Sequence, residues 1–202
     1  MQLKNKVKSI ITDFIPVNEK IDKPITKFGG QPNWCVELNW PLSRETGNPM
    51  RFICQILLDN RLFPDGENKV AYIFMTDEED FVNGTWEPDS GENAVIIQSF
   101  SNTSQHNTVK DSLVGPTLEA EYEVKCSFVQ ENPEGSEEYG NKIGGEPDFI
   151  QGEEYPDGEG WQLLLQLDST ETPFEINFGD AGIGYAFINK DCTEGKFLWQ
   201  CH

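Results

Sequence analysis

The feature that most constrains the fold is a motif that occurs twice in the chain. Lys27–Trp34 reads KFGGQPNW, and Lys142–Phe149 reads KIGGEPDF. Each copy is followed by an apolar run with a central glutamine, FICQIL at Phe52–Leu57 and LLLQL at Leu163–Leu167. Blocks that recur in the same order indicate a repeated structural unit, because each copy supplies the same supersecondary elements.

A third pair of blocks extends the match towards the end of each copy. Ala71–Met75 (AYIFM) corresponds to Gly184–Ile188 (GYAFI), again in the same order. A chain of 202 residues is long enough to bury a sizeable core as one domain. We therefore expect a single domain over residues 1–202, with internal repeats at approximately 20–115 and 118–202.

Strand patterns dominate the sequence, and helical patterns between them are scarce. Short runs rich in β-branched and aromatic residues, bounded by glycine, proline and aspartate, are typical of strands. They are Phe52–Leu58, Lys69–Thr76, Asn93–Phe100, Trp161–Asp168, Ile183–Ile188 and Lys196–Gln200. The predicted fold class is mainly β, or β-rich α+β, built from two pseudo-symmetric β-rich halves.

The N-terminal segment has a different pattern. Leu3, Val7, Ile10, Ile11 and Phe14 follow helical spacing ahead of a proline. Apolar residues three and four apart form one face of a helix. The sequence therefore predicts a short amphipathic helix at the start of the chain, with its apolar stripe packed on the body.

A long strand is predicted where the second repeat begins, because apolar and polar residues alternate there without interruption. Period-two alternation places every second side chain on the same face of a sheet. The apolar set is Leu118, Ala120, Tyr122, Val124, Cys126 and Phe128. We expect this set to face the core and the intervening, mostly acidic set to face water.

The charge of the chain indicates which partners are disfavoured, and its cysteine content indicates its cellular compartment. The chain has 15 Lys and Arg against 35 Asp and Glu, a net charge of −20. Nucleic acids and anionic membranes are disfavoured, because both are bound through clustered basic residues. The five cysteines are an odd number and include no Cys-x-x-Cys pair, which predicts reduced thiols. No apolar run is long enough for a signal peptide or a membrane span, so we expect a cytoplasmic protein.

The glycine motif predicts a rigid turn in each copy. Glycine reaches positive φ at little cost, and proline fixes φ and biases the residue before it towards extended geometry. The residues are Gly29, Gly30 and Pro32 in the first copy and Gly144, Gly145 and Pro147 in the second. Such turns can also present N–H groups to an anion, but the acidic composition favours a structural role.

Gln55 and Gln166 interrupt strands that are otherwise apolar. A buried amide without partners costs about 1–3 kcal/mol, so each must find hydrogen bonds. We expect each glutamine to bond backbone groups of a glycine turn, either in its own half or in the other half. The alternative is an amide that reads a ligand in a cleft between the halves.

These motifs carry a family resemblance. They are the two glycine turns, the glutamine-bearing strands, and Gly179, Asp180, Gly182, Tyr185 and Phe187. In this order they resemble the YwqG-like family of bacterial proteins over roughly residues 25 to 202. The resemblance implies a duplicated, mainly β fold of a bacterial cytoplasmic protein without a defined biochemical role, and it brings no catalytic residues.

Candidate reactive groups are few. Asp77, Glu78, Glu79 and Asp80 follow a strand and are weak candidates for Ca²⁺, although they lack the spacing of a Ca²⁺ loop. With only His106 and His202, a catalytic triad or a three-histidine metal site is disfavoured. We therefore expect no cofactor.

Two functions are consistent with the sequence. The first is a non-enzymatic cytoplasmic binding protein that recognises a basic protein through its acidic surface, for example as a toxin-neutralising immunity protein. The alternative is a small-molecule or Ca²⁺-dependent enzyme or binding protein that uses a cleft between the halves. Its candidate binding residues are Gln55, Gln166, Trp34 and Asp180.

Overall fold

The structure is a computed structural model that describes residues 7–80, 82–100, 114–130 and 140–202. The strands are β1 (Val7–Val17), β2 (Lys27–Phe28), β3 (Arg51–Leu57), β4 (Lys69–Met75), β5 (Asn93–Ser99), β6 (Glu121–Gln130), β7 (Lys142–Gly144), β8 (Gln162–Asp168), β9 (Ile183–Ile188) and β10 (Gly195–Gln200). One 3₁₀ turn, η1 (Ser169–Glu171), follows β8. The predicted mainly β class is confirmed, and the six predicted strands correspond to β3, β4, β5, β8, β9 and β10.

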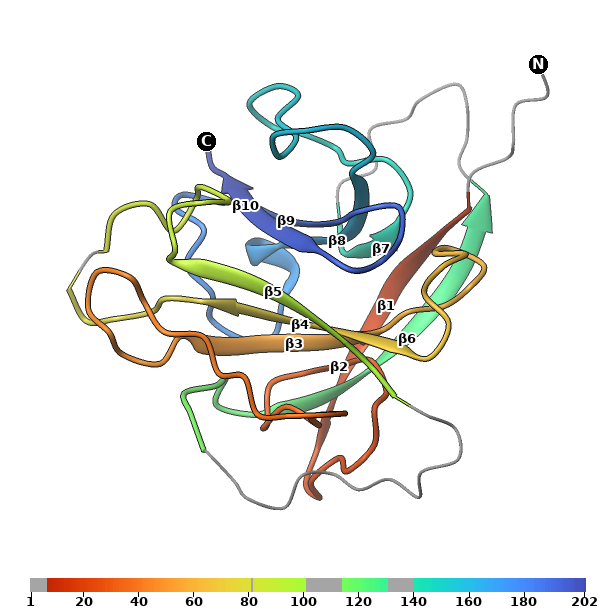
Figure 1. Ribbon diagram of the computed structural model, residues 1–202, viewed down its shortest axis with the longest axis horizontal. Coiled ribbons are helices and arrows are strands. Elements are labelled where there is room, and N and C mark those ends of the chain that lie inside the picture. The colour runs from red at the N-terminus through yellow and green to blue at the C-terminus, as the bar shows by residue number, and fades with distance from the viewer. Residues whose placement is uncertain (1–6, 81, 101–113, 131–139) are drawn as a thin grey trace.

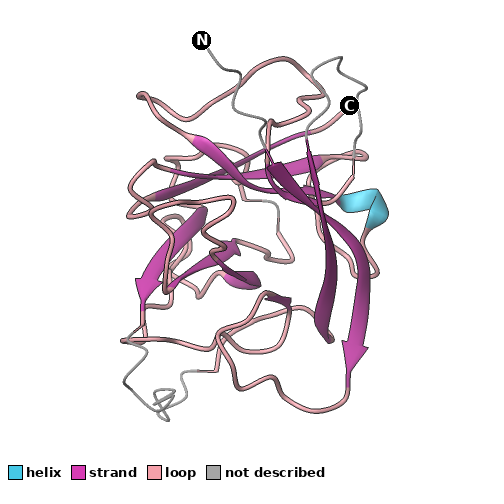
Figure 2. Ribbon diagram, turned by 90° about the vertical axis from the view of Figure 1, so that its right-hand side faces the viewer, coloured by secondary structure: helices cyan, strands magenta, loops and turns pink. Residues whose placement is uncertain are grey.

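The strands form one closed barrel in the order β1-β6-β2-β3-β4-β5-β10-β9-β8-β7. Figure 1 shows β2 to β5 on one side and β7 to β10 on the other, with β1 and β6 crossing beside them. Figure 2 shows that strands and loops make up almost all of the described chain. No helix in that part of the chain is long and apolar enough to cross a membrane.

The prediction of an N-terminal helix is wrong. Residues Val7–Val17 form β1, which pairs antiparallel with β6 along its whole length. This segment is rich in β-branched residues, whose stiff χ1 angles favour strands, and long-range pairing with β6 outweighs the helical spacing. A register shift between Ile11 and Asp13 also places Ile11 and Phe14 opposite Cys126 and Val124, so two apolar residues three apart share one face of the strand.

The two halves exchange their first strands. β1 precedes β2 in the chain but pairs with β7, through Ser9 opposite Ile143. β6 precedes β7 but pairs with β2, through Tyr122 opposite Phe28. β10 meets β5 at Gly195 opposite Val95, which joins the halves on the other side of the barrel. Each half therefore depends on the other for its hydrogen-bond ladder.

Corresponding residues of the halves occupy matching places. In the β2–β3 ladder Lys27 lies opposite Gln55, and in the β7–β8 ladder Lys142 lies opposite Gln166. β3 and β8 each contain a register shift, after Phe52 in the former and after Leu163 in the latter. These matches agree with the predicted repeats, while a common ancestor of the halves stays a prediction.

The core explains why the central strands read as unbroken apolar runs. Alternate residues of β4 belong to different clusters, with Ala71 and Ile73 in one and Tyr72 and Phe74 in another. The first cluster draws on both halves of the barrel. The second is covered by the segment that follows the first glycine turn, including Trp34. Strands buried on both faces do not alternate in hydrophobicity.

The prediction for the long alternating strand is only partly right. β6 forms over Glu121–Gln130, and Tyr122 near its start is buried. Cys126 and Phe128, which we expected in the core, are exposed instead. The physical reason is that β2 pairs with β6 only at Tyr122 and Glu123, so the later part of β6 extends past the barrel wall alongside β1.

Candidate functional site

Gln55 fastens the first glycine turn to the barrel. Its side chain on β3 is fully buried, and its Oε1 accepts a 2.8 Å hydrogen bond from the backbone N–H of Asn33, directly after Pro32. Its Nε2 donates to the carbonyls of Ile25, at 2.8 Å, and Lys23, at 3.2 Å. The oxygen and the nitrogen of the amide therefore both form hydrogen bonds with backbone groups.

Gln166 repeats this arrangement in the second half. Its Oε1 accepts a 2.8 Å bond from the N–H of Asp148, directly after Pro147, and its Nε2 donates to the carbonyl of Gly140 at 3.1 Å. The prediction that each glutamine bonds a turn is confirmed, and the turn belongs to the same half. A ligand read by either amide would have to displace these bonds.

The glycine turns have the backbone shape that the motif predicts. Gly29 and Gly30 have φ values of 66° and 63°, and Gly144 and Gly145 have 72° and 81°. A Cβ on Gly29 would overlap the carbonyl oxygen of Ala120, so this turn also needs glycine for close approach to the chain entering β6. The N–H of Gly29 donates to Ile53 at 2.8 Å and is not available to an anion.

A buried lysine accompanies each turn, and the sequence analysis missed both. Lys27 pairs with Glu121 and also donates from Nζ to the carbonyl of Gln31 at 2.7 Å. Burial lowers the pKa of Lys27, and the hydrogen bond and charge of Glu121 oppose that shift. Lys142 pairs with Asp148 at 2.5 Å. The available signal was a lysine at the same position in both motif copies.

Trp34 lies in the core and is not presented to a ligand. It is 5% exposed, and its ring centroid lies 4.8 Å from that of Tyr72. The Tyr72 hydroxyl donates to the carbonyl of Asn33 at 2.7 Å, and in the second half Tyr185 donates to Asp148 at 2.8 Å. The hydroxyls of Tyr72 and Tyr185 therefore anchor the two turns to β4 and β9.

Asp180 is not brought together with the other predicted binding residues. It is exposed in the turn ahead of β9, between the buried side chain of Phe178 and the strand. Its backbone carbonyl accepts a 3.1 Å hydrogen bond from the N–H of His202. The segment is a turn that leads into β9. His106 lies outside the described residues.

Carboxylates of the acidic run after β4 contact different partners. Asp77 forms an ion pair with Arg51, while Glu78 accepts hydrogen bonds from Thr46 at 2.8 Å and Asn48 at 3.0 Å. Across the described ranges, no three His, Cys, Asp or Glu side chains are grouped to hold a metal ion. Calcium binding by Asp77, Glu78, Glu79 and Asp80 stays a prediction.

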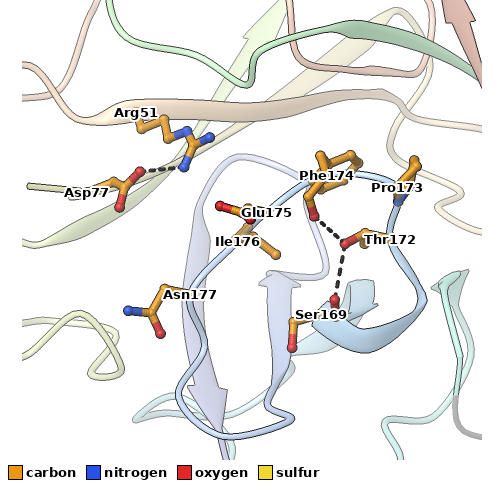
Figure 3. A pocket seen from close by; sticks show the side chains of 9 residues that line it. All are labelled: Arg51, Asp77, Ser169, Thr172, Pro173, Phe174, Glu175, Ile176 and Asn177. Atoms are coloured by element: carbon orange, nitrogen blue, oxygen red, sulfur yellow. Dashed lines mark hydrogen bonds and ion pairs between the residues drawn. The ribbon is translucent and has the colours of Figure 1, made fainter.

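A concave surface lies between the halves. This groove, which we call the seam groove, has a volume of about 680 Å³. Arg51 and Asp77 at the ends of β3 and β4 line it from the first half, and the segment Ser169–Asn177 lines it from the second (Figure 3). Sequence reasoning foresaw a cleft between the halves but named none of these residues except Asp77.

Aromatic packing holds the second-half wall of the seam groove in place. The Phe174 ring lies 5.8 Å from Phe28 and 5.6 Å from Phe14, measured between centroids. The hydroxyl of Thr172 lies 2.8 Å from the Phe174 carbonyl, as Figure 3 shows. This wall therefore rests on β1 and β2 of the other half, which fixes the shape of the groove.

The charge of the seam groove is negative. Arg51 is the one cationic side chain among its described lining residues, and the carboxylate of Asp77 neutralises it. Glu175 adds a further, exposed carboxylate, and Ser169 and Asn177 add polar groups. This arrangement suits a positively charged or polar group better than an anion.

Comparison with known proteins identifies a family but assigns no activity. No curated protein matches the chain. One family model matches residues 26–197, a span that includes both glycine turns and both glutamines. The match covers most of the 202 residues and ends within β10. The chain therefore belongs to the family described as Domain of unknown function (DUF1963).

Proposed function

We propose that this protein is a non-enzymatic binding protein that recognises a positively charged partner protein. The observation that carries the proposal is the seam groove, where Asp77 neutralises Arg51 and Glu175 remains as an exposed carboxylate. A basic side chain entering this groove meets net negative charge on walls that are already in place. Preorganised walls reduce the entropy that binding costs.

The surface around the seam groove supports the same conclusion. Glu79 and Asp80, which follow Asp77 in the chain, are exposed, and Glu171 is exposed at the start of the opposite wall. A net charge of −20 steers a basic partner towards the protein over distances of about a Debye length, roughly 8 Å at physiological salt. Rim charges of this kind act mainly on the association rate.

We further infer a bacterial cytoplasmic setting and membership of the YwqG-like group. The support is the cysteine usage and the motif order described above. Neutralisation of a basic toxin, as an immunity protein, is one concrete form of the proposed function. It would use the charge complementarity described here and would need no reaction.

A capture experiment with matched charge variants tests this function. The protein would be immobilised and exposed to native lysate at low salt, and bound proteins would be released at about 0.5 M salt, above the physiological range. The captured partner would then be purified and its Kd measured. The Asp77→Asn/Glu175→Lys variant frees Arg51 and reverses one carboxylate, so we expect Kd to rise about tenfold, or about 1.4 kcal/mol.

The control is the Glu19→Lys/Asp22→Asn variant, which makes the same change in net charge at exposed positions outside the seam groove. We expect its Kd to stay within about twofold of the unmodified protein, since exposed pairs contribute about 0–1 kcal/mol. Equal losses for the two variants would show that only overall charge matters, and the seam groove would lose its assigned role. Failure to capture any salt-released protein would overturn the proposal.

The volume of the seam groove favours a second candidate function. Small-molecule sites commonly occupy about 300–1,000 Å³, and the groove falls in this range. A small-molecule or Ca²⁺-dependent activity in the cleft would then replace protein recognition. A thermal-shift screen with divalent cations, sugars and nucleotides separates the two, because one large shift that Asp77→Asn/Glu175→Lys abolishes would favour the small molecule.

A further inference from the structure

A second groove lies between the segment that follows β3 and the second glycine turn, and it does not depend on the function proposed above. It has a volume of about 380 Å³ and is lined by the second glycine turn, by Arg61 and by the aromatic side chains Tyr155 and Trp161. It is more enclosed than the seam groove. We call it the aromatic groove.

Tyr155 in this groove is exposed and Trp161 is half-buried, and both side chains have contacts within the protein. Tyr155 is 44% exposed, which is unusual for a large aromatic side chain of the barrel. Its ring makes contacts with Phe149 and Phe187 at centroid distances of 5.3 Å and 5.4 Å. The indole N–H of Trp161 donates to the carbonyl of Asp157 at 3.0 Å. Both rings therefore keep their positions without a ligand.

The electrostatic field around these rings is negative. The loop at residues 151–160 contains Glu153, Glu154, Asp157 and Glu159 and no basic residue. Burial raises the pKa of the Tyr155 hydroxyl, and the charge of Glu153 raises it further. Glu146 also lines the groove and is exposed.

The one cationic side chain among the described lining residues is already neutralised. The guanidinium of Arg61 donates to both carboxylate oxygens of Asp59, at 2.8 Å and 2.5 Å. It also lies over the ring of Phe128, with its central carbon 3.6 Å from the ring centroid. A cation entering the aromatic groove is therefore not opposed by an unpaired positive charge.

From this combination we propose that the aromatic groove binds a small organic cation that carries an alkylated ammonium group. The negative faces of aromatic rings attract such cations, and the nearby carboxylates add long-range attraction. The alkyl groups fit the apolar side of the groove, where Leu62 and Leu163 also line it. Anions would be repelled, and a neutral ligand of the same shape would lack the charge attraction.

Isothermal titration with choline and its neutral isostere 3,3-dimethyl-1-butanol, both at a fixed ionic strength of about 0.15 M, tests the proposal. The isostere replaces the ammonium nitrogen by carbon and keeps the shape. We expect choline to bind at least about tenfold more tightly than the isostere. Equal affinity, or no heat from choline at millimolar concentrations, would overturn the proposal.

Substitutions at Tyr155 distinguish the contribution of its aromatic face to choline binding from the contribution of its apolar bulk. Tyr155→Leu keeps apolar bulk but removes the aromatic face, and we expect choline affinity to fall roughly 3- to 30-fold. Tyr155→Phe keeps the face and should bind choline within about twofold of the unmodified protein. Should Tyr155→Leu unfold, Glu153→Gln is the second variant, with Glu67→Gln as its charge-matched control outside the groove.

We expect Glu153→Gln, and not Glu67→Gln, to weaken choline binding. Full choline affinity in both Tyr155→Leu and Glu153→Gln would place the ligand elsewhere and overturn the assignment. A peptide with trimethyllysine, tested in parallel, shows whether the groove prefers a free cation or an alkylated side chain of a protein. If the peptide bound about tenfold more tightly than choline, the assignment to a small free ligand would be wrong.

Discussion

The backbone N–H of Asn33 donates a 2.8 Å hydrogen bond to the buried side chain of Gln55, which connects a glycine turn to the centre of a strand. The same bond joins Asp148 to Gln166 in the other half, also at 2.8 Å. Each glutamine thereby fixes a turn whose neighbouring aromatic residue, Trp34 in the first half, packs in a core cluster with Tyr72 and Phe74. The amides belong to the scaffold that shapes the grooves.

Replacing Gln55 by leucine should destabilise the protein. The variant leaves the buried N–H of Asn33 and the partly buried carbonyls of Ile25 and Lys23 without their partner. Each unsatisfied buried group costs about 1–3 kcal/mol, so we expect the free energy of unfolding to fall by at least about 2 kcal/mol. Urea denaturation measures this. The exposed Gln130→Leu is the control, and equal stability of the two variants would contradict the role of Gln55.

Gly29→Ala should be far more harmful than Gly47→Ala. Both glycines have positive φ, 66° and 75°, so both variants carry similar backbone strain. Only at Gly29 would the added Cβ overlap backbone, at the carbonyl of Ala120, whereas nothing lies within 4 Å at Gly47. We expect Gly29→Ala to lose about 1–3 kcal/mol more, measured by thermal or urea unfolding. Similar losses would mean that the turn can move away from the chain ahead of β6.

Lys27 should make stability depend on pH in the alkaline range. Its pKa in the folded protein is lowered from 10.5, chiefly by burial. Between the lowered value and 10.5, the unfolded chain binds more protons than the folded chain, so this group makes stability rise with pH in that window. Below the lowered value both states hold the proton, and the contribution is constant.

The measurement compares unfolding free energies of the unmodified protein and Lys27→Met across this alkaline window. We expect the difference to shift in favour of the unmodified protein as pH rises, while the exposed Lys125→Met controls for loss of one positive charge. A difference that stays flat, or moves the other way, would mean that Lys27 is charged at least as easily in the fold as in the unfolded chain.

Thiol labelling should report the exposure of β6. Cys126 is exposed, whereas Cys54 and Cys192 are buried. Burial raises the pKa of Cys54 well above 9.0 and also raises that of Cys126, where a hydrogen bond with Ser9 opposes the shift. With a disulfide reagent we expect Cys126 to react fastest among these three, and Cys54 and Cys192 only as the protein unfolds. Loss of the fast phase in Cys126→Ser confirms the assignment, and its persistence refutes it.

Local sequence patterns were sufficient for the glycine turns and for the central strands. Positive φ at Gly29 and Gly144 follows from the chemistry of the motif itself. The buried amide of Gln55 had to find partners, because an unpaired one is too costly, and a glycine turn of its own half or of the other half was the predicted place. The strand β1 was misread because spacing alone cannot tell a short amphipathic helix from a strand that has a bulge and a long-range partner.

The sequence by itself determined that the chain forms β-strands and carries the same rigid turn twice, since these features depend on residues close together in the chain. Only the tertiary structure decided that β1 and β6 are exchanged between the halves, that Lys27 is buried against Glu121, and that Phe174 closes a groove lined by Arg51. The physical reason is that these contacts join residues about 100 positions apart or more, and their energies depend on burial and pairing that the whole barrel creates.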